Sequence, residues 1–276
     1  MTSGTLYVVA TPLGNLGDLT QRSRDLLRSV PVVAAEDTRR TRVLLESVQA
    51  SPRLVSFHAH SPQTRLNQIL DALAAGTDVA LVTDAGTPAV SDPGAVLVAA
   101  ARKAGILVIP LPGPSALVTA LSVAGFSADR FTFLGFLPRK GKDRRELIDF
   151  IVGSPWTVVL YEAANRLERT LADLVEKCDG TRLAVVAREL TKKYEDIQAG
   201  TLDSLAVYYG EHPPRGEVTV VIGAATGTTR HPDPDQLNAR GRQLLAEGLS
   251  GRDAALELAG QMGISRNEAY RVINSL

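Results

Sequence analysis

Short apolar runs alternate with longer amphipathic segments along most of the chain, and this alternation constrains the fold more than any other feature. The runs are rich in valine, and most are too short to be helices, as in Val79–Val82 (VALV). Parallel strands that are buried on both faces have this continuous apolar character, and each needs a crossover helix to reach the next strand. We therefore predict an α/β fold built on a mostly parallel sheet. The expected strands are residues 6–10, 30–34, 53–57, 79–82, 106–110, 156–161, 182–187 and 216–223, and the expected helices are residues 20–29, 66–74, 95–104, 115–124 and 167–177.

The length of 276 residues predicts two domains, since one domain usually takes about 100–200 residues. Small and turn-forming residues at 124–128 (AGFSA) separate the two halves, so we expect one α/β domain over residues 1–125 and another over 126–225. Residues 236–276 have a different character and predict a small helical tail. Its spacing resembles a helix-turn-helix, with a turn at Gly263 and a second helix from Ser265. A helical hairpin that only docks or tethers is an equally open interpretation.

The charge balance excludes some classes of partner. Lysine and arginine number 30, aspartate and glutamate number 30, and the net charge is zero, which argues against a protein that coats nucleic acid by charge alone. Only local basic patches remain possible. The single cysteine, Cys178, excludes an internal disulfide and suits a reducing compartment. The longest apolar stretch, residues 95–111, is interrupted by Arg102, Lys103 and Gly105, so we expect a cytoplasmic protein without a membrane segment.

Residues 82–94 (VTDAGTPAVSDPG) hold two glycines, two prolines and two aspartates directly after an apolar run. Asp84 closes the strand, Gly86 permits a close backbone approach, and Asp92 precedes the next helix. An ordinary strand-to-helix turn needs fewer such residues, and ligands in open α/β sheets bind at the carboxyl ends of strands. Similar loops follow three other strands, at residues 11–15 (TPLGN), 35–41 (AEDTRRT) and 111–115 (LPGPS). No triphosphate-binding loop is present, so a compact ligand is expected.

Five segments in this order resemble one known family. They are LYVVATPLGNLGDLT, AAEDTRRTRVLL, VTDAGTPAVSDPG, LPGPSALVTALSVAG and FLGFLPRKGKDRR. The chain is similar over about residues 6–223 to bacterial 16S ribosomal RNA cytidine-2′-O-methyltransferases, which belong to the tetrapyrrole-methylase superfamily. The resemblance implies two α/β domains of the tetrapyrrole-methylase type with S-adenosylmethionine in the cleft between them, and a homodimer. It also implies that the substrate is a cytidine in the decoding region of 16S rRNA, in naked RNA or in the assembled small ribosomal subunit.

The donor site needs an apolar slot with a few well-placed polar groups. The loops of the first domain and the strand ends of the second supply both, and we expect no metal ion. The residues expected to bind the donor are Pro12, Leu13, Asp84, Ala85, Gly86, Thr87, Val90, Ser115, Ala116, Tyr161 and Leu190.

Methyl transfer to a ribose hydroxyl requires that its proton be removed or that the hydroxyl be placed in line with the methyl group. The candidates for this role are Glu36, Asp37 and His58, although one of the two acids can instead cap the following helix, and a lone histidine is more often a surface residue. Two basic clusters are expected to contact RNA phosphates. These are Arg39 and Arg40 in one cluster and Arg139, Lys140, Lys142 and Arg144 in the other.

Residues 161–166 (YEAANR) depart from the family pattern, in which the resemblance leads us to expect Tyr-Glu-Ser-Pro-His-Arg. Tyr161, Glu162 and Arg166 match, whereas Asn165 stands in place of the histidine and can orient a group but not deprotonate it. Two alternatives stay open. One is a methylase of the same superfamily that acts on a tetrapyrrole or another small substrate. The other is a non-catalytic nucleotide-sensing or RNA-binding module.

Overall fold

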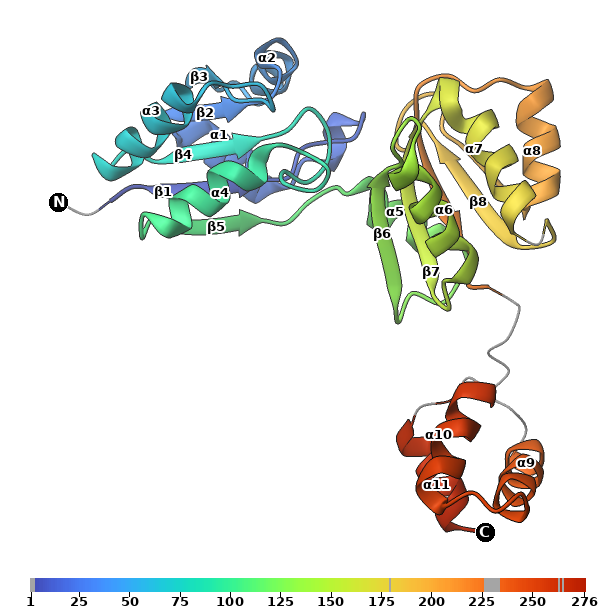
Figure 1. Ribbon diagram of the computed structural model, residues 1–276. Coiled ribbons are helices and arrows are strands. Elements are labelled where there is room, and N and C mark those ends of the chain that lie inside the picture. Colours follow the sequence, from blue (N-terminus) through green and yellow to red (C-terminus); the bar gives the residue numbers. More distant parts are fainter. Residues whose placement is uncertain (1–2, 179, 226–233, 263, 265) are drawn as a thin grey trace. The chain divides into compact units, whose positions relative to one another are not determined.

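The structure is a computed structural model, and it describes residues 3–178, 180–225, 234–262, 264 and 266–276 (Figure 1). The chain divides into two compact units, Met1–Val152 with Trp156–Gly223, and Gly153–Pro155 with Ala224–Leu276. The described part of the first unit contains two five-stranded sheets, and that of the second contains three helices. The expectation of an α/β protein with a helical tail is therefore confirmed.

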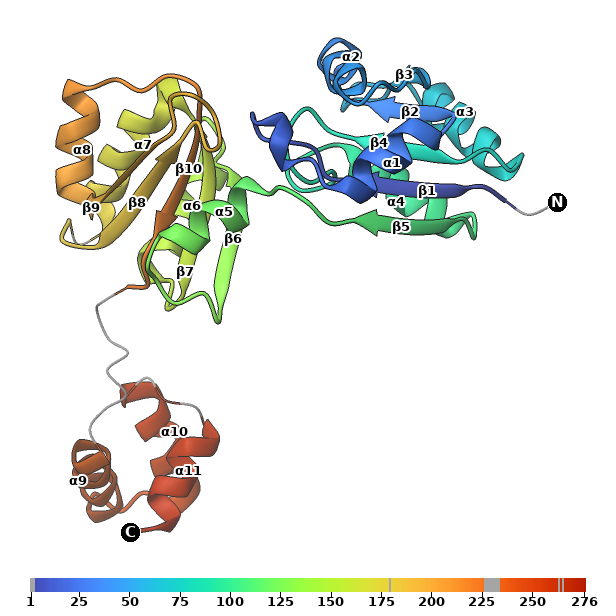
Figure 2. The ribbon, with the colours of Figure 1, turned by 180° about the vertical axis from the view of Figure 1, so that it is seen from behind.

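The first sheet is entirely parallel and has the strand order β3-β2-β4-β1-β5. Its elements are β1 (Thr5–Val9), α1 (Gln21–Ser29), β2 (Val32–Ala35), α2 (Thr38–Ser47), β3 (Arg53–Ser56), α3 (Gln63–Ala74), β4 (Val79–Val82), α4 (Gly94–Lys103) and β5 (Leu107–Leu111), with a short 3-10 helix at Leu16–Asp18. Helices α1 and α2 cover one face and α3 and α4 the other (Figure 2). Strands β2 and β4 are consequently buried throughout, which explains their uninterrupted apolar sequence.

The second sheet is mixed and has the strand order β6-β7-β10-β8-β9. Its elements are α5 (Ala116–Val123), β6 (Phe131–Phe136), α6 (Lys142–Gly153), β7 (Thr157–Ala163), α7 (Ala164–Lys177), β8 (Leu183–Arg188), β9 (Asp196–Thr201), α8 (Leu202–Glu211) and β10 (Glu217–Ile222). Only β6 and β7 are parallel neighbours in this sheet, so the prediction of parallel strands holds for the first sheet alone. Seven residues without a helix join β8 to β9, and such a short connection can only link antiparallel strands.

Helix α5 belongs by its packing to the second sheet. Its buried residues Ala120 and Leu121 share a core with Val159 of β7 and Val221 of β10. Helices α6, α7 and α8 cover the opposite face of this sheet. The predicted boundary near residue 125 assigns α5 to the first half, whereas the chain passes to the second sheet earlier, between β5 and α5.

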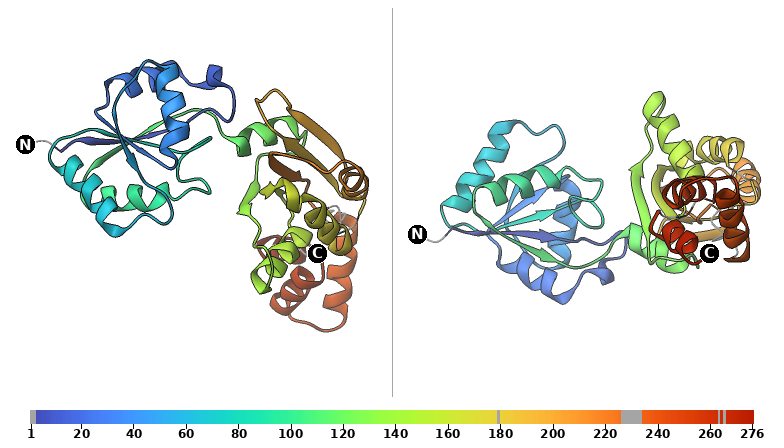
Figure 3. Two further views of the ribbon diagram at one scale, coloured as in Figure 1. Left: turned by 90° about the horizontal axis from the view of Figure 1, so that it is seen from above. Right: turned by 60° about the horizontal axis from the view of Figure 1, so that its bottom comes forward.

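The tail consists of α9 (Pro234–Ala246), α10 (Gly251–Met262) and α11 (Arg266–Asn274) (Figure 3). These helices bury a small apolar core. Leu244, Leu258 and Ile273 lie in this core, one from each helix. The expected turn at Gly263 and the expected helix start at Ser265 lie outside the described residues. Among the described helices, none has the length and apolar character that crossing a membrane requires.

Candidate active site

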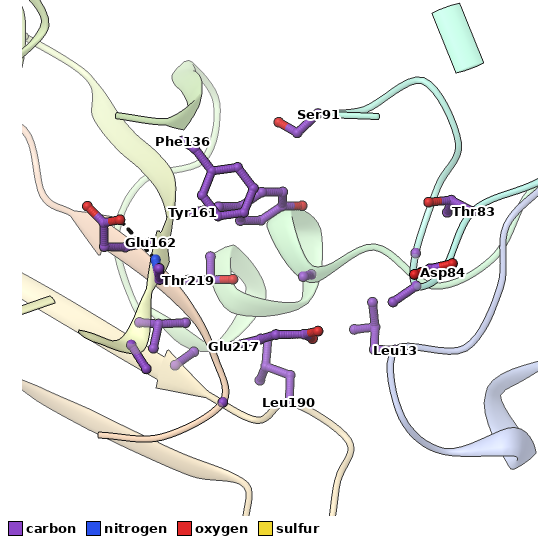
Figure 4. Close-up of a pocket in the computed structure, with 18 of the residues that line it drawn as sticks. Leu13, Thr83, Asp84, Ser91, Phe136, Tyr161, Glu162, Leu190, Glu217 and Thr219 are labelled. Atoms are coloured by element: carbon purple, nitrogen blue, oxygen red, sulfur yellow. Dashed lines mark hydrogen bonds between the residues drawn. The ribbon is translucent and has the colours of Figure 1, made fainter. Parts of the chain in front are cut away.

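A cavity of about 740 Å³ in the first unit is lined by loops of the parallel sheet and by strands of the mixed sheet (Figure 4). Because the strands of the first sheet are parallel, the loops after β1, β2, β4 and β5 reach the same edge, as the sequence predicts. Ten of the eleven expected donor-binding residues line the cavity, and Pro12 does not. The ten are Leu13, Asp84, Ala85, Gly86, Thr87, Val90, Ser115, Ala116, Tyr161 and Leu190.

The loop after β4 is held against the loop after β1. The backbone N–H of Thr11 donates to the carbonyl of Gly86 at 2.8 Å, and the N–H of Gly86 donates to the carbonyl of Thr11 at 3.0 Å. Gly86 has φ +84°, and a Cβ at this position would lie 3.3 Å from Cδ2 of Leu13. Only glycine adopts this conformation readily and leaves the space beside Leu13 open for a ligand.

Thr83 joins two carboxyl groups at the wall of the cavity. Its hydroxyl oxygen lies 2.9 Å from Oε2 of Glu36 and 2.7 Å from Oδ2 of Asp92. A hydroxyl has one proton and can donate to only one of these oxygens, so the other contact requires a proton on a carboxyl group. Burial raises the pKa of Glu36, the hydrogen bond from Thr83 opposes this shift, and the carboxylates of Asp92 and Asp84 add to it. Glu36 therefore holds a proton at higher pH than an exposed glutamate does.

Asp84 is fixed by groups from the loop after β2 and from α2. Its Oδ1 accepts the backbone N–H of Asp37 at 3.0 Å, and its Oδ2 lies 3.5 Å from the guanidinium of Arg40. Burial raises the pKa of Asp84, although the hydrogen bond from Asp37 and the charge of Arg40 oppose it. Arg40, expected to contact RNA, therefore lines the cavity beside the carboxylate of Asp84, which is expected to bind the donor.

Asp37 and His58, the other candidates for proton transfer, do not line the cavity. Asp37 caps α2, since its Oδ1 accepts the backbone N–H of Arg39 at 2.9 Å. The hydrogen bond from the Arg39 side chain is the main reason that the pKa of Asp37 falls to about 2. His58 is exposed in the turn after β3. Of the three candidates, Glu36 is the one that the fold brings to the cavity.

Two aromatic rings, Phe136 and Tyr161, form part of the wall on the side of the second sheet, and Phe133 packs against Tyr161 from outside the cavity lining. The Tyr161 ring lies edge-on to Phe133, with centroids 4.9 Å apart, and Phe136 is tilted against Tyr161 at 5.6 Å. The Tyr161 hydroxyl accepts the backbone N–H of Leu117 at 3.2 Å, which fixes the ring beside α5. Figure 4 shows Phe136 and Tyr161 side by side at the cavity.

Residues 161–166, the motif that differs from the family pattern, also lie at the cavity. Ala163, Ala164 and Asn165 all line it. The Glu162 carboxylate is buried and accepts hydrogen bonds from the Thr170 hydroxyl at 2.7 Å and the backbone N–H of Ala163 at 2.9 Å. It also forms an ion pair with Arg166 at 3.1 Å. The two charged residues that match the family pattern therefore bind each other.

The residues of the second basic cluster differ in their exposure to solvent. Arg139 and Lys140 are exposed just before α6, and Lys142 is exposed at its first residue, 3.4 Å from Glu146. Arg144 is 4% exposed, and all three of its guanidinium nitrogens donate to protein oxygens: Asp173, Thr170 and the carbonyl of Pro138. This corrects the expectation that Arg144 contacts RNA, because a buried guanidinium engaged in this way cannot reach a phosphate.

Comparison with known proteins places these features in a family. The family model described as "Tetrapyrrole (Corrin/Porphyrin) Methylases" matches residues 5–206. The structure of a uroporphyrin-III C-methyltransferase from Thermus thermophilus, in complex with S-adenyl homocysteine, superposes with a TM-score of 0.59. The alignment covers 80% of this chain and 97% of that one at 19% identity, which supports the fold alone. The fold is thus that of a tetrapyrrole methylase, and the chain belongs to this family.

Curated relatives narrow this class. "Ribosomal RNA small subunit methyltransferase I" of Synechocystis sp. is 44% identical over 271 residues, which are 98% of this chain and 97% of the relative. The protein of the same name from Escherichia coli O157:H7 is 41% identical over 270 residues, covering 97% of this chain and 94% of the relative. The chain therefore belongs to the ribosomal RNA small subunit methyltransferase I family of the tetrapyrrole methylases.

Sequence reasoning did not identify Thr83, Phe136 and Glu217 as site residues, yet all three line the cavity. Thr83 lies in the 82–94 loop directly before Asp84, and the glycines, prolines and aspartates of that loop drew attention away from it. Phe136 had one local signal, because Gly135 interrupts a strand of large apolar residues and such a glycine often marks a bulge. Glu217 begins the last strand and had no signal, since only tertiary packing brings β10 beside β8.

Proposed function

We propose that this protein transfers a methyl group from S-adenosylmethionine to the ribose 2′-hydroxyl of a cytidine in the decoding region of 16S rRNA. The observation that carries the proposal is the position of the 82–94 loop, whose Asp84, Gly86 and Thr87 line a cavity shared by both sheets. The names of the curated relatives support ribosomal RNA of the small subunit as the substrate.

The residues present fit the donor. Small residues at Ala85, Gly86, Ser115 and Ala116 leave a cradle that larger side chains would fill, and Leu13 provides an apolar cover. The Asp84 carboxylate lines the same cavity and favours a positively charged ligand. When bound, the donor supplies a methyl group activated by its sulfonium charge.

In this proposal the Glu36 carboxylate accepts the proton of the 2′-hydroxyl. A glutamate whose pKa is raised is a more effective base than an exposed one, provided that it is ionised. Asp92 and Thr83 hold Glu36 in position, and Asp92 is itself fixed at the start of α4 by the backbone N–H groups of Ala89 and Gly94. The exposed side chains of Arg39, Arg139 and Lys140 are proposed to contact RNA phosphates.

The test is transfer of radiolabelled methyl from S-adenosylmethionine to small ribosomal subunits that lack 2′-O-methylation, followed by mapping of the label. Label on a decoding-region cytidine ribose is the expected result, and fully methylated subunits are the matched control. Transfer to a tetrapyrrole supplied in a parallel reaction, with no transfer to subunits, would support the small-substrate alternative. Donor binding without transfer to any substrate would support the non-catalytic alternative.

A cytoplasmic location and a homodimer complete the proposal. The homodimer is what the family resemblance implies, and the cytoplasmic location fits a reaction on ribosomal RNA. Sedimentation of the full-length protein tests the oligomeric state directly. A monomer at micromolar concentration would contradict the dimer and leave the proposed reaction intact.

A further inference from the structure

We propose that Phe136 is a base-stacking residue, whose ring supports the face of the nucleobase that belongs to the methylated ribose. This inference rests on the proposed RNA methylation and adds the residue that orients the nucleotide. Four features of the structure carry it: a bulge in β6, the exposure of the Phe136 ring, the anchoring of the following segment, and the place of β6 in the sheet.

The bulge in β6 determines which way Phe136 points. Phe133 pairs with Val159 of β7, but Phe136 pairs with Tyr161, so one extra residue is inserted between the two pairs. Gly135 has φ +62°, and a Cβ there would lie 2.8 Å from Oγ of Ser91. Successive side chains of a strand alternate between faces, so without the bulge Phe136 would point toward the core formed with α6, α7 and α8. With the bulge, it shares the face of Tyr161 at the cavity. Bulges next to active sites commonly redirect a side chain in this manner.

Packing in the protein core does not account for the exposure of Phe136. Phe136 is 55% exposed although it lines the cavity, whereas the next residue, Leu137, is 1% exposed in the core. Phenylalanine is among the residues most often buried, so an exposed ring in a cavity wall indicates a ligand surface. The contact with Tyr161 at 5.6 Å supports the ring from behind.

The segment after Phe136 is anchored and basic. Arg166 donates to the carbonyls of Leu137 and Pro138, and Arg144 donates to the carbonyl of Pro138 at 3.2 Å. Arg139 and Lys140 follow directly, and both are exposed. An aromatic face beside cations that track a phosphate backbone is the arrangement with which proteins bind single-stranded nucleic acid. The hydrogen bonds to the Leu137 and Pro138 carbonyls hold the backbone between the ring and the two cations.

The place of β6 favours RNA over the adenine of the donor as the stacking partner. β6 is one of the two edge strands of the sheet, and three inter-strand steps separate it from β8. Strands β8 and β10 contribute Ala187, Val218 and Thr219 to the cavity. At about 4.8 Å per step, β6 lies about 14 Å from β8. A donor seated against β8, β10 and Leu190 leaves the edge strand free for the second substrate.

The experiment compares Phe136→Ala and Phe136→Trp with the wild-type protein on small ribosomal subunits that lack 2′-O-methylation. Removing one base-stacking ring should weaken RNA binding and raise the KM for subunits by about 5- to 150-fold. The KM and Kd for S-adenosylmethionine should change less than about twofold, and Phe136→Trp should restore most of the RNA affinity because its ring also stacks. Phe150→Ala is the matched control, since Phe150 on α6 is 44% exposed and does not line the cavity.

Three results would overturn the proposal. Unchanged subunit affinity in Phe136→Ala, with active wild-type protein, would leave the proposed function standing and remove only the stacking role. A selective rise in the Kd for S-adenosylmethionine would assign the ring to the donor instead. Wild-type protein that neither binds nor methylates subunits would refute the proposed function and this inference together.

Discussion

Arg144 should stabilise the fold without contacting RNA, and Arg144→Met tests this directly. The guanidinium donates to Asp173 at 2.6 and 3.0 Å, to Thr170 at 3.1 Å and to the Pro138 carbonyl at 3.2 Å. Removing one partner of a fully buried ion pair costs about 3–5 kcal/mol. The Asp173 side chain is 31% exposed, so water recovers part of this loss, and we expect the free energy of unfolding to fall by about 2–3 kcal/mol.

Urea denaturation followed by the fluorescence of Trp156, the single tryptophan, measures this change because Trp156 directly precedes β7, a strand of the sheet that α6 covers. Arg139→Met is the matched control, since Arg139 is exposed on the same segment and should change stability by less than about 0.5 kcal/mol. The salt dependence of RNA binding should instead change in the variants of the exposed residues and stay the same in the Arg144 variant. Replacing Arg139 and Lys140 by alanine should reduce the slope of log affinity against log salt by about 1.4, at about 0.7 for each lost phosphate contact, whereas Arg144→Met should leave the slope unchanged. A loss of stability below about 1 kcal/mol, or a flattened salt slope in Arg144→Met, would refute the structural role.

Three further predictions concern the site and its surroundings. Gly86→Val should lower S-adenosylmethionine affinity at least about tenfold in calorimetry, because a branched side chain is strained at φ +84° and would crowd Leu13; wild-type affinity would contradict our account of the loop. Glu36→Gln should reduce kcat by about 10²- to 10⁴-fold. Because the base acts ionised and its pKa is raised, the kcat of the wild-type protein should fall as the pH drops through that pKa, and a pH profile of the same shape in the glutamine variant would exclude Glu36 as the base. Tyr209→Phe should leave stability unchanged or raise it by about 1 kcal/mol in thermal denaturation, since the buried hydroxyl has no hydrogen-bond partner among the described residues; a clear loss would reveal a partner.

Local patterns predicted the elements and the first sheet well. The expected strand at residues 6–10 and the expected helix at 20–29 agree with β1 and α1 to within about a residue, because apolar periodicity and the Thr20 cap are local signals. The loop at residues 82–94 was recognised from composition alone, and Asp84, Gly86 and Thr87 do line the cavity. Their expected role in donor binding stays a prediction.

The second sheet was less predictable. β9 was not recognised, because its exposed and half-buried positions give little apolar signal. The antiparallel pairing of β10 with β7 and β8 depends on contacts between distant segments, which no local pattern encodes. The placement of α5 on this sheet has the same origin.

The sequence by itself therefore determined the α/β class, the helical tail, the family and the loops that form the cavity, because each of these leaves a periodic or compositional pattern within a few residues. Only the tertiary structure decided which charged and aromatic side chains are available for chemistry. Arg139 and Arg144 are five residues apart in one basic run, yet one is exposed and the other is buried against Asp173. Glu36 and Asp37 are adjacent, yet only Glu36 lines the cavity. The burial of a side chain, its hydrogen-bond and ion-pair partners and the direction in which it points are properties of the packed chain. They distinguish neighbouring residues that look equivalent in the sequence.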